Sequence, residues 1–265
     1  MRIAVYTCAT DSHLPTWVPN NRQDLAIDFL LFTTNSKTTA KGWKTRQIPS
    51  SRELDPYRIT RLAKAMPHRF LDDYDLSVYV DSNVKPQSSW LSNIVNLMGP
   101  KVIGLFSRGY LLEHEFAKVA QRRYDDLVTL ERQYATYKYL SGSVLTREVQ
   151  WGGLIVRRHL DDDCKRFGER WWENIVRFSR RDQLSLPLAL EEIAAERRVI
   201  WAEEFNGILD ILPKPAKSVE YLFGEPYEKL VPRSFFSREA HLEREVTQLR
   251  RILKSKLISQ IRGNH

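Results

Sequence analysis

The chain has 265 residues, of which 42% are hydrophobic and 28% are charged, a composition typical of a folded protein rather than a disordered one. Its two cysteines, Cys8 and Cys164, are too few for a disulfide framework and indicate a reducing compartment. The formal charge of +8 favours anionic partners, and no apolar run is long enough to cross a membrane. Because a strand is expected almost from Met1, we expect no signal peptide and a cytoplasmic protein.

Apolar runs typical of strands alternate with helical patterns along the chain. Strands are predicted over residues 1–10, 28–34, 43–48, 76–80, 102–106, 154–156 and 199–203. Helices are predicted over residues 55–66, 89–97, 113–139, 168–177 and 182–198. Asp55 and Pro56 favour the start of the first helix, and Pro67 favours its end. This alternation predicts an α/β fold with a mostly parallel sheet and helices on both faces.

The last part of the chain differs from the rest. We interpret residues 1–212 as one domain, residues 213–236 as a proline-containing connector and residues 237–265 as a basic amphipathic helix. Seven basic and three acidic residues between Arg238 and Arg262 give a charge of +4, half of the total. Two interpretations of residues 238–262 stay open, peripheral contact with the inner face of a membrane and homo-oligomerisation. The rest of the chain is only mildly basic, so we expect no nucleic-acid partner.

Polar residues follow several predicted strands, and the segment Asp81-Ser82-Asn83 follows the one over residues 76–80. In open α/β sheets, ligands bind beyond the carboxyl ends of the strands. A carboxylate at Asp81 with a second oxygen donor at Asn83 can hold a divalent cation, which in turn neutralises a diphosphate. The alternative is a plain turn, because Asp, Ser and Asn are common turn residues.

The helix predicted over residues 55–66 carries two neighbouring cations. Tyr57, Arg61 and Lys64 lie at i, i+4 and i+7 and therefore share one face. Arg61 and Lys64 repel each other unless an anion such as a diphosphate lies between them. The alternative is a solvated basic face.

Three segments combine these residues with others in a specific order. The first runs from Arg61-x-x-Lys64-x-x-Pro67-His68 through Tyr74-Asp75 to Val80-Asp81-Ser82-Asn83. The second is Gly152-Gly153-Leu154-Ile155-Val156-Arg157-Arg158-His159, and the third runs from Trp172 through Ser179-Arg180-Arg181-Asp182-Gln183 to Pro187. Together they resemble GT-A glycosyltransferases, in particular the family 8-like group and the plant mucilage-associated glycosyltransferase-like family. The resemblance covers residues 3–205.

The resemblance implies a GT-A, Rossmann-like domain that binds a nucleotide sugar. It implies a donor-binding set of Tyr6, Thr7, Arg61, Lys64, Asp81, Ser82, Asn83, Gly152 and Gly153, with Asp182 and Gln183 as catalytic residues at the transferred sugar. Glycines at that position suit close approach of the backbone to a ligand. Two alternatives stay open, namely that Gly152-Gly153 forms a tight turn and that Asp182 is a helix N-cap.

The resemblance also implies Mn²⁺ or Mg²⁺ at Asp81 and Asn83. Asn83 stands where relatives have a second acid, which removes a negative charge from such a site. Relatives that use a metal supply a late histidine, and after residue 159 this chain offers only His241 and His265. Metal use is therefore a hypothesis.

Three further groups of residues have two interpretations each. Arg157, Arg158 and His159 either bind phosphate or an acidic acceptor, or are solvated at a strand end. Trp171-Trp172 belongs either to the core or to a sugar platform. Glu113 and Glu115 are interpreted as acids near a helix N-terminus.

The leading functional prediction is transfer of a hexosyl-type sugar from a UDP-sugar to a saccharide or glycan acceptor. If the resemblance holds, the anomeric configuration is retained. The alternative is a non-catalytic nucleotide-sugar-binding or scaffold protein that acts through its C-terminal helix.

Overall fold

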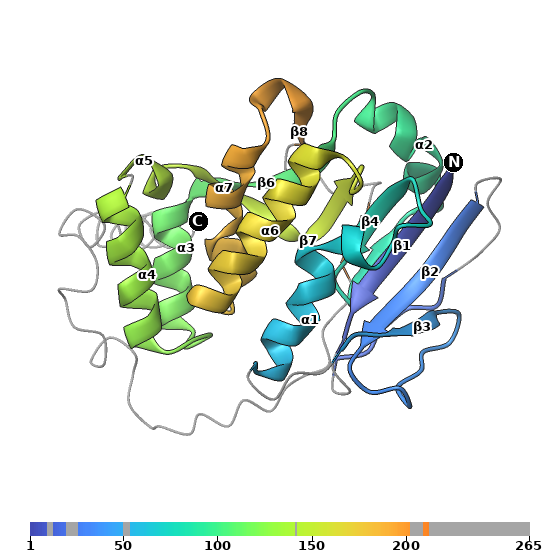
Figure 1. Ribbon diagram of the computed structural model, residues 1–265, viewed down its shortest axis with the longest axis horizontal. Coiled ribbons are helices and arrows are strands. Elements are labelled where there is room, and N and C mark those ends of the chain that lie inside the picture. Colours follow the sequence, from blue (N-terminus) through green and yellow to red (C-terminus); the bar gives the residue numbers. More distant parts are fainter. Residues whose placement is uncertain (10–12, 20–25, 50–53, 141, 202–208, 212–265) are drawn as a thin grey trace, which may run out of the picture.

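The computed structural model describes residues 1–9, 13–19, 26–49, 54–140, 142–201 and 209–211 (Figure 1). The connector and the C-terminal helix expected over residues 213–265 lie outside these residues, as does any membrane or oligomer contact they make. Within the described part of the chain, no helix combines the length and apolar character needed to cross a membrane.

Seven strands form one mixed sheet in the order β3-β2-β1-β4-β7-β6-β8. They are β1 (Arg2–Cys8), β2 (Ala26–Thr33), β3 (Lys44–Gln47), β4 (Leu76–Val80), β6 (Ile103–Leu111), β7 (Glu148–Arg157) and β8 (Arg198–Trp201). β7 is antiparallel to β4 and β6, and the other neighbouring strands pair in parallel. A small second sheet pairs β5 (Val84–Pro86) with β9 (Leu209–Ile211). The expected α/β fold with a mostly parallel sheet is confirmed.

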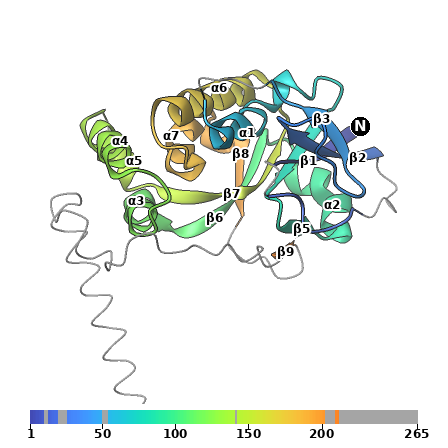
Figure 2. The ribbon, with the colours of Figure 1, turned by 90° about the horizontal axis from the view of Figure 1, so that it is seen from below.

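Helices cover both faces of the large sheet, as predicted. The described α-helices are α1 (Pro56–Ala65), α2 (Ser88–Met98), α3 (Leu112–Gln121), α4 (Leu127–Leu140), α5 (Gly142–Leu145), α6 (Asp162–Arg177) and α7 (Leu186–Ala189). Short 3-10 turns are η1 (Pro67–Arg69), η2 (Asp182–Leu184), η3 (Leu190–Glu192) and η4 (Ala195–Arg197). Figure 2 shows α1, α6 and α7 on one side of the sheet and α2 on the other.

The core follows the alternation of side chains along each strand. In β1, Ala4 and Tyr6 belong to the cluster under α1 and α6, whereas Ile3 and Val5 belong to the cluster under α2. Trp171 of α6 is fully buried in the first cluster, so the core interpretation holds for it. The chain enters α1 through Asp55, whose side chain accepts from the backbone N–H groups of Tyr57 and Arg58, as its N-cap role predicts.

Two segments, each predicted as one continuous helix, are interrupted in the structure, so these two predictions are wrong. The segment over residues 113–139 is two helices, because the chain turns after α3 with a positive φ of 48° at Arg123. Asp126 then accepts from the backbone N–H of Thr129 at 2.7 Å, which caps the start of α4. The segment over residues 182–198 is a series of short turns, η2, α7, η3 and η4. Pro187 lies at the start of α7 and cannot donate a helical hydrogen bond.

Two further elements are longer than predicted. α6 begins at Asp162, where Asp161 caps it by accepting from the backbone of Asp163 at 3.0 Å. β7 runs from Glu148 straight through Gly152 and Gly153, so the tight-turn interpretation of this glycine pair is wrong. Because the two glycines lie within β7, they are beside β4, at the edge of the sheet where β1 and β4 end.

Candidate functional site

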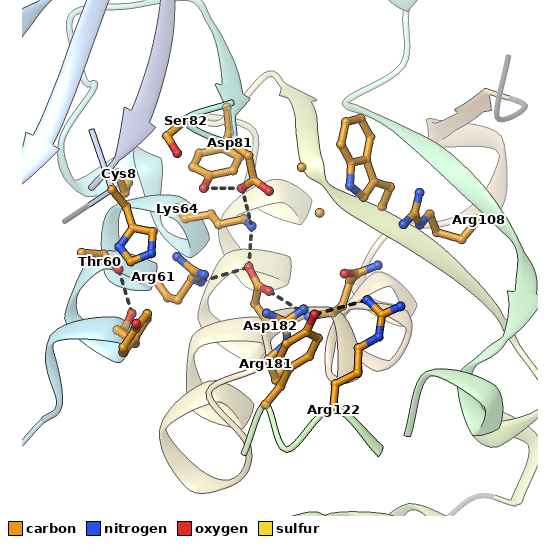
Figure 3. A pocket seen from close by; sticks show the side chains of 18 of the residues that line it. Cys8, Thr60, Arg61, Lys64, Asp81, Ser82, Arg108, Arg122, Arg181 and Asp182 are labelled. Atoms are coloured by element: carbon orange, nitrogen blue, oxygen red, sulfur yellow. Dashed lines mark hydrogen bonds and ion pairs between the residues drawn. The ribbon is translucent and has the colours of Figure 1, made fainter. Parts of the chain in front are cut away.

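A cavity of about 270 Å³ opens at the carboxyl ends of β1 and β4, bounded by α1, β7 and η2 (Figure 3). Most of the predicted site residues line it, namely Arg61, Lys64, Asp81, Ser82, Gly152, Gly153, Asp182 and Gln183. They come from four separate parts of the chain. The position agrees with the general location of ligand sites in open α/β sheets.

The centre of the cavity is a buried ion-pair network between α1 and η2. The Lys64 ammonium contacts the Asp182 carboxylate, and Arg61 Nε lies 3.2 Å from Asp182 Oδ2. Lys64 is 2% exposed and Asp182 is 5% exposed, so the interaction is shielded from water. The two cations on one face of α1 are therefore held together by an acid from another element, and the solvated-face interpretation is wrong.

The charges set the protonation of this network. Burial would raise the pKa of Asp182, but Lys64 and then Arg61 hold it far below the usual value. Burial lowers the pKa of Lys64, which Asp182 and Asp81 partly offset. Burial would also lower the pKa of Arg61, but Asp182, Tyr79 and Asp81 raise it overall. Asp182 is therefore ionised at neutral pH, so it is no proton donor there and is only a weak base.

The backbone of η2 aims Asp182 into the cavity. The indole Nε1 of Trp171 donates to the Asp182 carbonyl at 2.8 Å, which ties η2 to α6. Asp182 is the first residue of η2 and Arg181 occupies the cap position, so the N-cap interpretation of Asp182 is wrong. The adjacent Gln183 also lines the cavity, and its Nε2 is buried without a hydrogen-bond partner among the described residues.

Asp81 lies at the end of β4, where the turn interpretation is correct and the assignment to a donor or metal site stays a prediction. The backbone of Val84 donates to the Asp81 carbonyl at 2.8 Å, which closes a turn. The Asp81 carboxylate faces the cavity, accepts from the Tyr79 hydroxyl at 3.0 Å and lies 3.9 Å from Lys64 Nζ. Burial raises the pKa of Tyr79 well above its usual value, so this hydroxyl remains a donor.

The two glycines leave space for different neighbours, Gly152 for the charged centre and Gly153 for the Trp151 ring. A Cβ atom at Gly152 would lie 3.3 Å from Lys64 Nζ, and a Cβ atom at Gly153 would lie 2.3 Å from the Trp151 ring. The Gly153 carbonyl also accepts from the backbone of Asp81 at 2.8 Å. A side chain at Gly152 would crowd Lys64 and one at Gly153 would displace the Trp151 ring, while the approach of a ligand to this backbone stays a prediction.

Three predicted residues do not line the cavity. Tyr6 and Thr7 are fully buried in β1, and Asn83 is 6% exposed beyond the end of β4. The Tyr6 hydroxyl accepts from Arg157 inside the core. Their assignment to the donor stays a prediction, which requires these side chains to act through their neighbours or to move.

Arg157 and His159 are buried, Arg158 is half-buried, and none of the three lines the cavity. Arg157 is 1% exposed and donates to the carbonyls of Lys64 at 2.7 Å and Ala65 at 3.3 Å. Arg158 donates to backbone carbonyls between α2 and β6, and His159 Nε2 lies 2.7 Å from the Leu71 carbonyl. Arg157 thus fixes the end of α1 that carries Lys64.

Sequence reasoning missed the residues on the other side of the cavity. They are Arg108 of β6, Lys118 of α3, Arg122 and Tyr124 of the α3–α4 turn, Trp151 of β7 and Arg181 before η2. The one local signal was Arg181, which directly precedes Asp182. The others reach the cavity through the turn after α3 and the register of β6 with β7, which no local pattern reveals.

The oxygen donors of the cavity fit a divalent cation poorly. Among the described residues, no group of three or more His, Cys, Asp or Glu side chains converges. Asp182 is occupied by Lys64 and Arg61, Asp81 faces the Lys64 ammonium, and Asn83 does not line the cavity. A metal held by Asp81 and Asn83 would lie beside an ammonium group, with one carboxylate to balance it. The described residues of the cavity therefore do not form a site for a resident divalent cation.

No protein-family profile and no curated protein sequence matches the chain. Several solved structures are similar to it, among them a galactosyltransferase and a xylosyltransferase. The galactosyltransferase LgtC, in complex with donor and acceptor sugar analogues, is 17% identical, with 74% of this chain and 72% of that chain covered and a TM-score of 0.40. Mouse xyloside xylosyltransferase 1 in its apo form is 8% identical, and the match covers 77% of this chain and 86% of that chain with a TM-score of 0.42. Because both TM-scores are below 0.5, neither likeness bears on the function of this chain.

Proposed function

We propose that the chain is a GT-A glycosyltransferase that moves a hexosyl-type sugar from a nucleotide sugar, UDP-linked, to a saccharide or glycan acceptor with retention. The observation that carries the proposal is the convergence of Arg61, Lys64, Asp81 and Asp182 at the carboxyl ends of β1 and β4. The order of the same residues in the sequence supports it independently.

In this proposal Arg61 and Lys64 hold the departing diphosphate. Arg61 pairs with Asp182 through Nε and retains further N–H donors, and the Lys64 ammonium retains donors beyond the one directed at Asp182. Both cations are fixed in place before substrate binds, Lys64 by Asp182 and by the Arg157 contact to its carbonyl. Such preorganised charges stabilise a leaving group without a reorganisation cost.

Asp182 is the proposed catalytic carboxylate at the transferred sugar, with Gln183 beside it. Because Asp182 stays ionised, it can stabilise the positive charge that develops on a sugar ring as the diphosphate leaves. The buried Gln183 amide can donate to a sugar hydroxyl or to the attacking acceptor. The acceptor hydroxyl then attacks the anomeric carbon, and its proton leaves with the diphosphate.

The proposal requires no divalent cation, because Arg61 and Lys64 supply the positive charge that faces the diphosphate. Nucleotide-sugar dependence is tested by a thermal-shift screen of UDP, GDP and CDP sugars, because a ligand bound to the folded state raises the melting temperature. We expect a UDP-sugar to give the largest shift and to be hydrolysed slowly to UDP without an acceptor. A protein that binds UDP-sugars but never hydrolyses or transfers them would support the non-catalytic alternative. A chain that binds none of them would refute both.

A further inference from the structure

The cavity has two halves of different charge. In Figure 3, Cys8, Thr60 and Ser82 lie on one side of the Lys64–Asp182 pair, and Arg108 and Arg122 lie on the other. On the first side the cations Arg61 and Lys64 are matched by the carboxylates of Asp81 and Asp182. On the second side, among the described residues, Arg122 and Arg181 have no carboxylate partner.

The two arginines of the second side are held in place by one tyrosine. Arg122 Nη1 lies 3.3 Å from the Tyr124 hydroxyl, and the Arg181 guanidinium lies 4.7 Å from the centre of the Tyr124 ring. Arg181 Nε is buried and has no hydrogen-bond partner among the described residues. Both guanidinium groups line the cavity, so their remaining donors are available to a ligand there.

The turn that carries Arg122 and Tyr124 is fixed to the segment that carries Arg181. The Asp125 carboxylate accepts from the Ser179 hydroxyl at 2.7 Å and from the backbone of Arg180 at 2.9 Å. Arg180 Nη2 also lies 3.5 Å from the Tyr124 carbonyl. The backbone positions of Arg122 and Arg181 are therefore set by the fold, and the exposed Arg122 side chain is oriented by its contact with Tyr124.

The hydroxyl of Tyr124 responds to this concentration of positive charge. Its pKa is lowered, mainly by the hydrogen bond from Arg122 and, against an opposing effect of burial, by the charges of Arg122, Arg181 and Lys118. Lys118 is itself paired with Glu115 at 3.0 Å, whereas Arg122 and Arg181 form no ion pair with a carboxylate among the described residues.

We propose that Arg122 and Arg181, with Tyr124, form a subsite for a carboxylate or phosphate group on the acceptor, so that the acceptor is an anionic saccharide. This inference rests on the proposed function, because it places the donor diphosphate at Arg61 and Lys64 and the transferred sugar at Asp182. The second side of the cavity lies on the far side of Asp182 from the ends of β1 and β4. In this proposal the acceptor therefore binds there. Two preordered guanidinium groups are suited to bidentate binding of a planar carboxylate or a phosphate.

The test compares three matched sugars on UDP-saturated protein, where the donor side is filled: glucuronate, glucose 6-phosphate and glucose. Binding is measured by isothermal titration calorimetry at low and at 0.5 M NaCl. We expect at least one anionic sugar to bind about tenfold more tightly than glucose, with the difference reduced at high salt. Preference for glucuronate assigns a carboxylate, and preference for glucose 6-phosphate assigns a phosphate. Equal binding of all three sugars overturns the proposal.

Matched variants distinguish binding at this subsite from a general effect of the protein's positive charge. Arg122 is exposed, so Arg122→Gln should fold normally, and we expect it to bind the preferred anionic sugar at least fivefold more weakly. Arg122→Lys should retain part of the affinity. Arg170→Gln removes the same charge from the exposed face of α6, where Arg170 lies 3.4 Å from Glu173, and should leave anion binding unchanged. Equal losses in Arg122→Gln and Arg170→Gln would overturn the subsite.

Measurements of UDP affinity distinguish a failure of the acceptor subsite from a failure of the proposed function. If Arg122→Gln loses UDP affinity as strongly as Arg61→Gln does, the two arginines bind the donor diphosphate and the acceptor subsite is wrong. If wild-type protein binds no UDP, the proposed function fails, and the sugar titrations on ligand-free protein still decide whether an anion subsite exists.

Discussion

Arg61 Nε lies 3.2 Å from Asp182 Oδ2, and this contact, with that of Lys64, joins α1 to η2 across the floor of the cavity. The pair of cations is acceptable inside the protein because an acid from a distant part of the chain is buried with them. A buried charge without its partner is costly, so the same contact has consequences for stability and for catalysis.

Asp182→Asn keeps the shape of the side chain and removes its charge. It leaves Lys64 and Arg61 buried beside a neutral amide, so we expect the free energy of unfolding to fall by about 3 kcal/mol. Glycosyl transfer should be lost, because the carboxylate that faces the sugar is gone. UDP should now stabilise the variant more than it stabilises the wild type, since the diphosphate supplies the missing negative charge.

The matched control for this experiment is Asp162→Asn, in which the changed carboxylate is 83% exposed and pairs with Lys165 at 2.9 Å. It should be close to neutral. Chemical denaturation and donor turnover measure both effects. Wild-type stability together with wild-type turnover in Asp182→Asn would contradict the role of the network.

Asp81→Ala tests the strand end. The Asp81 side chain is 30% exposed and its hydrogen bond from Tyr79 is local, so we expect the fold to persist with a small loss of stability. Transfer should fall by several orders of magnitude if Asp81 positions Lys64 and the diphosphate. A far-ultraviolet circular dichroism spectrum and a melting curve establish folding before activity is compared. Normal turnover in a folded Asp81→Ala protein would remove Asp81 from the donor site.

The strand-end half of the cavity could be predicted from the sequence because its signals are local. Asp55 and Pro56 place the start of α1 and hence the shared face of Arg61 and Lys64. The apolar run of β4 places Asp81 at a strand end. Each inference needs only a few neighbouring residues and the general rule for ligand sites in α/β sheets.

The other half could not be predicted because it depends on contacts between distant segments. The residues around Arg122 have a helical pattern, and the break in the helix depends on Asp125 binding Ser179 and Arg180. The residues after Asp182 also have a helical pattern, but the Asp182 carbonyl accepts from Trp171 and from the Ser185 hydroxyl. Tertiary hydrogen bonds override local periodicity at both places.

Gly152 and Gly153 give contrasting predictions within one strand. Gly153→Ala places a Cβ 2.3 Å from the Trp151 ring, which forms part of the cavity wall, so the ring must move. We expect a loss of about 1–3 kcal/mol of stability together with lower activity. At Gly152 the nearest atom is the flexible end of Lys64, 3.3 Å away, so Gly152→Ala should fold well and mainly lower donor turnover. The reverse order of melting temperatures would contradict this geometry.

His159 should make the protein sensitive to mild acid. Burial lowers its pKa below the usual value, although the bond to the Leu71 carbonyl opposes this. The folded state therefore favours neutral His159. The stability that this residue contributes is fully present above its unfolded pKa of about 6.5 and is lost as the pH falls through the lower pKa of the folded state. The slope of the free energy of unfolding is at most about 1.4 kcal/mol per pH unit. His159→Gln can still donate to the carbonyl and should show a shallower slope, with His114→Gln as control. The lowered pKa of His68 acts in the same direction, so some slope will remain. Identical slopes in wild type and His159→Gln would contradict the assignment.

Removal of divalent cations tests how the diphosphate is neutralised. Arg61 and Lys64 line the cavity, whereas Asp81 is the one carboxylate there, among the described residues, that is not held by two cations. We therefore expect donor hydrolysis and transfer to continue at no less than about half the untreated rate after EDTA treatment and gel filtration, since the charges that stabilise the leaving group belong to the protein. Arg61→Gln should be far less active with or without Mn²⁺, whereas Arg170→Gln should match the wild type under both conditions. Complete loss of activity in EDTA, restored by Mn²⁺ or Mg²⁺, would show instead that the cavity binds a metal through Asp81 once the donor supplies its phosphate oxygens.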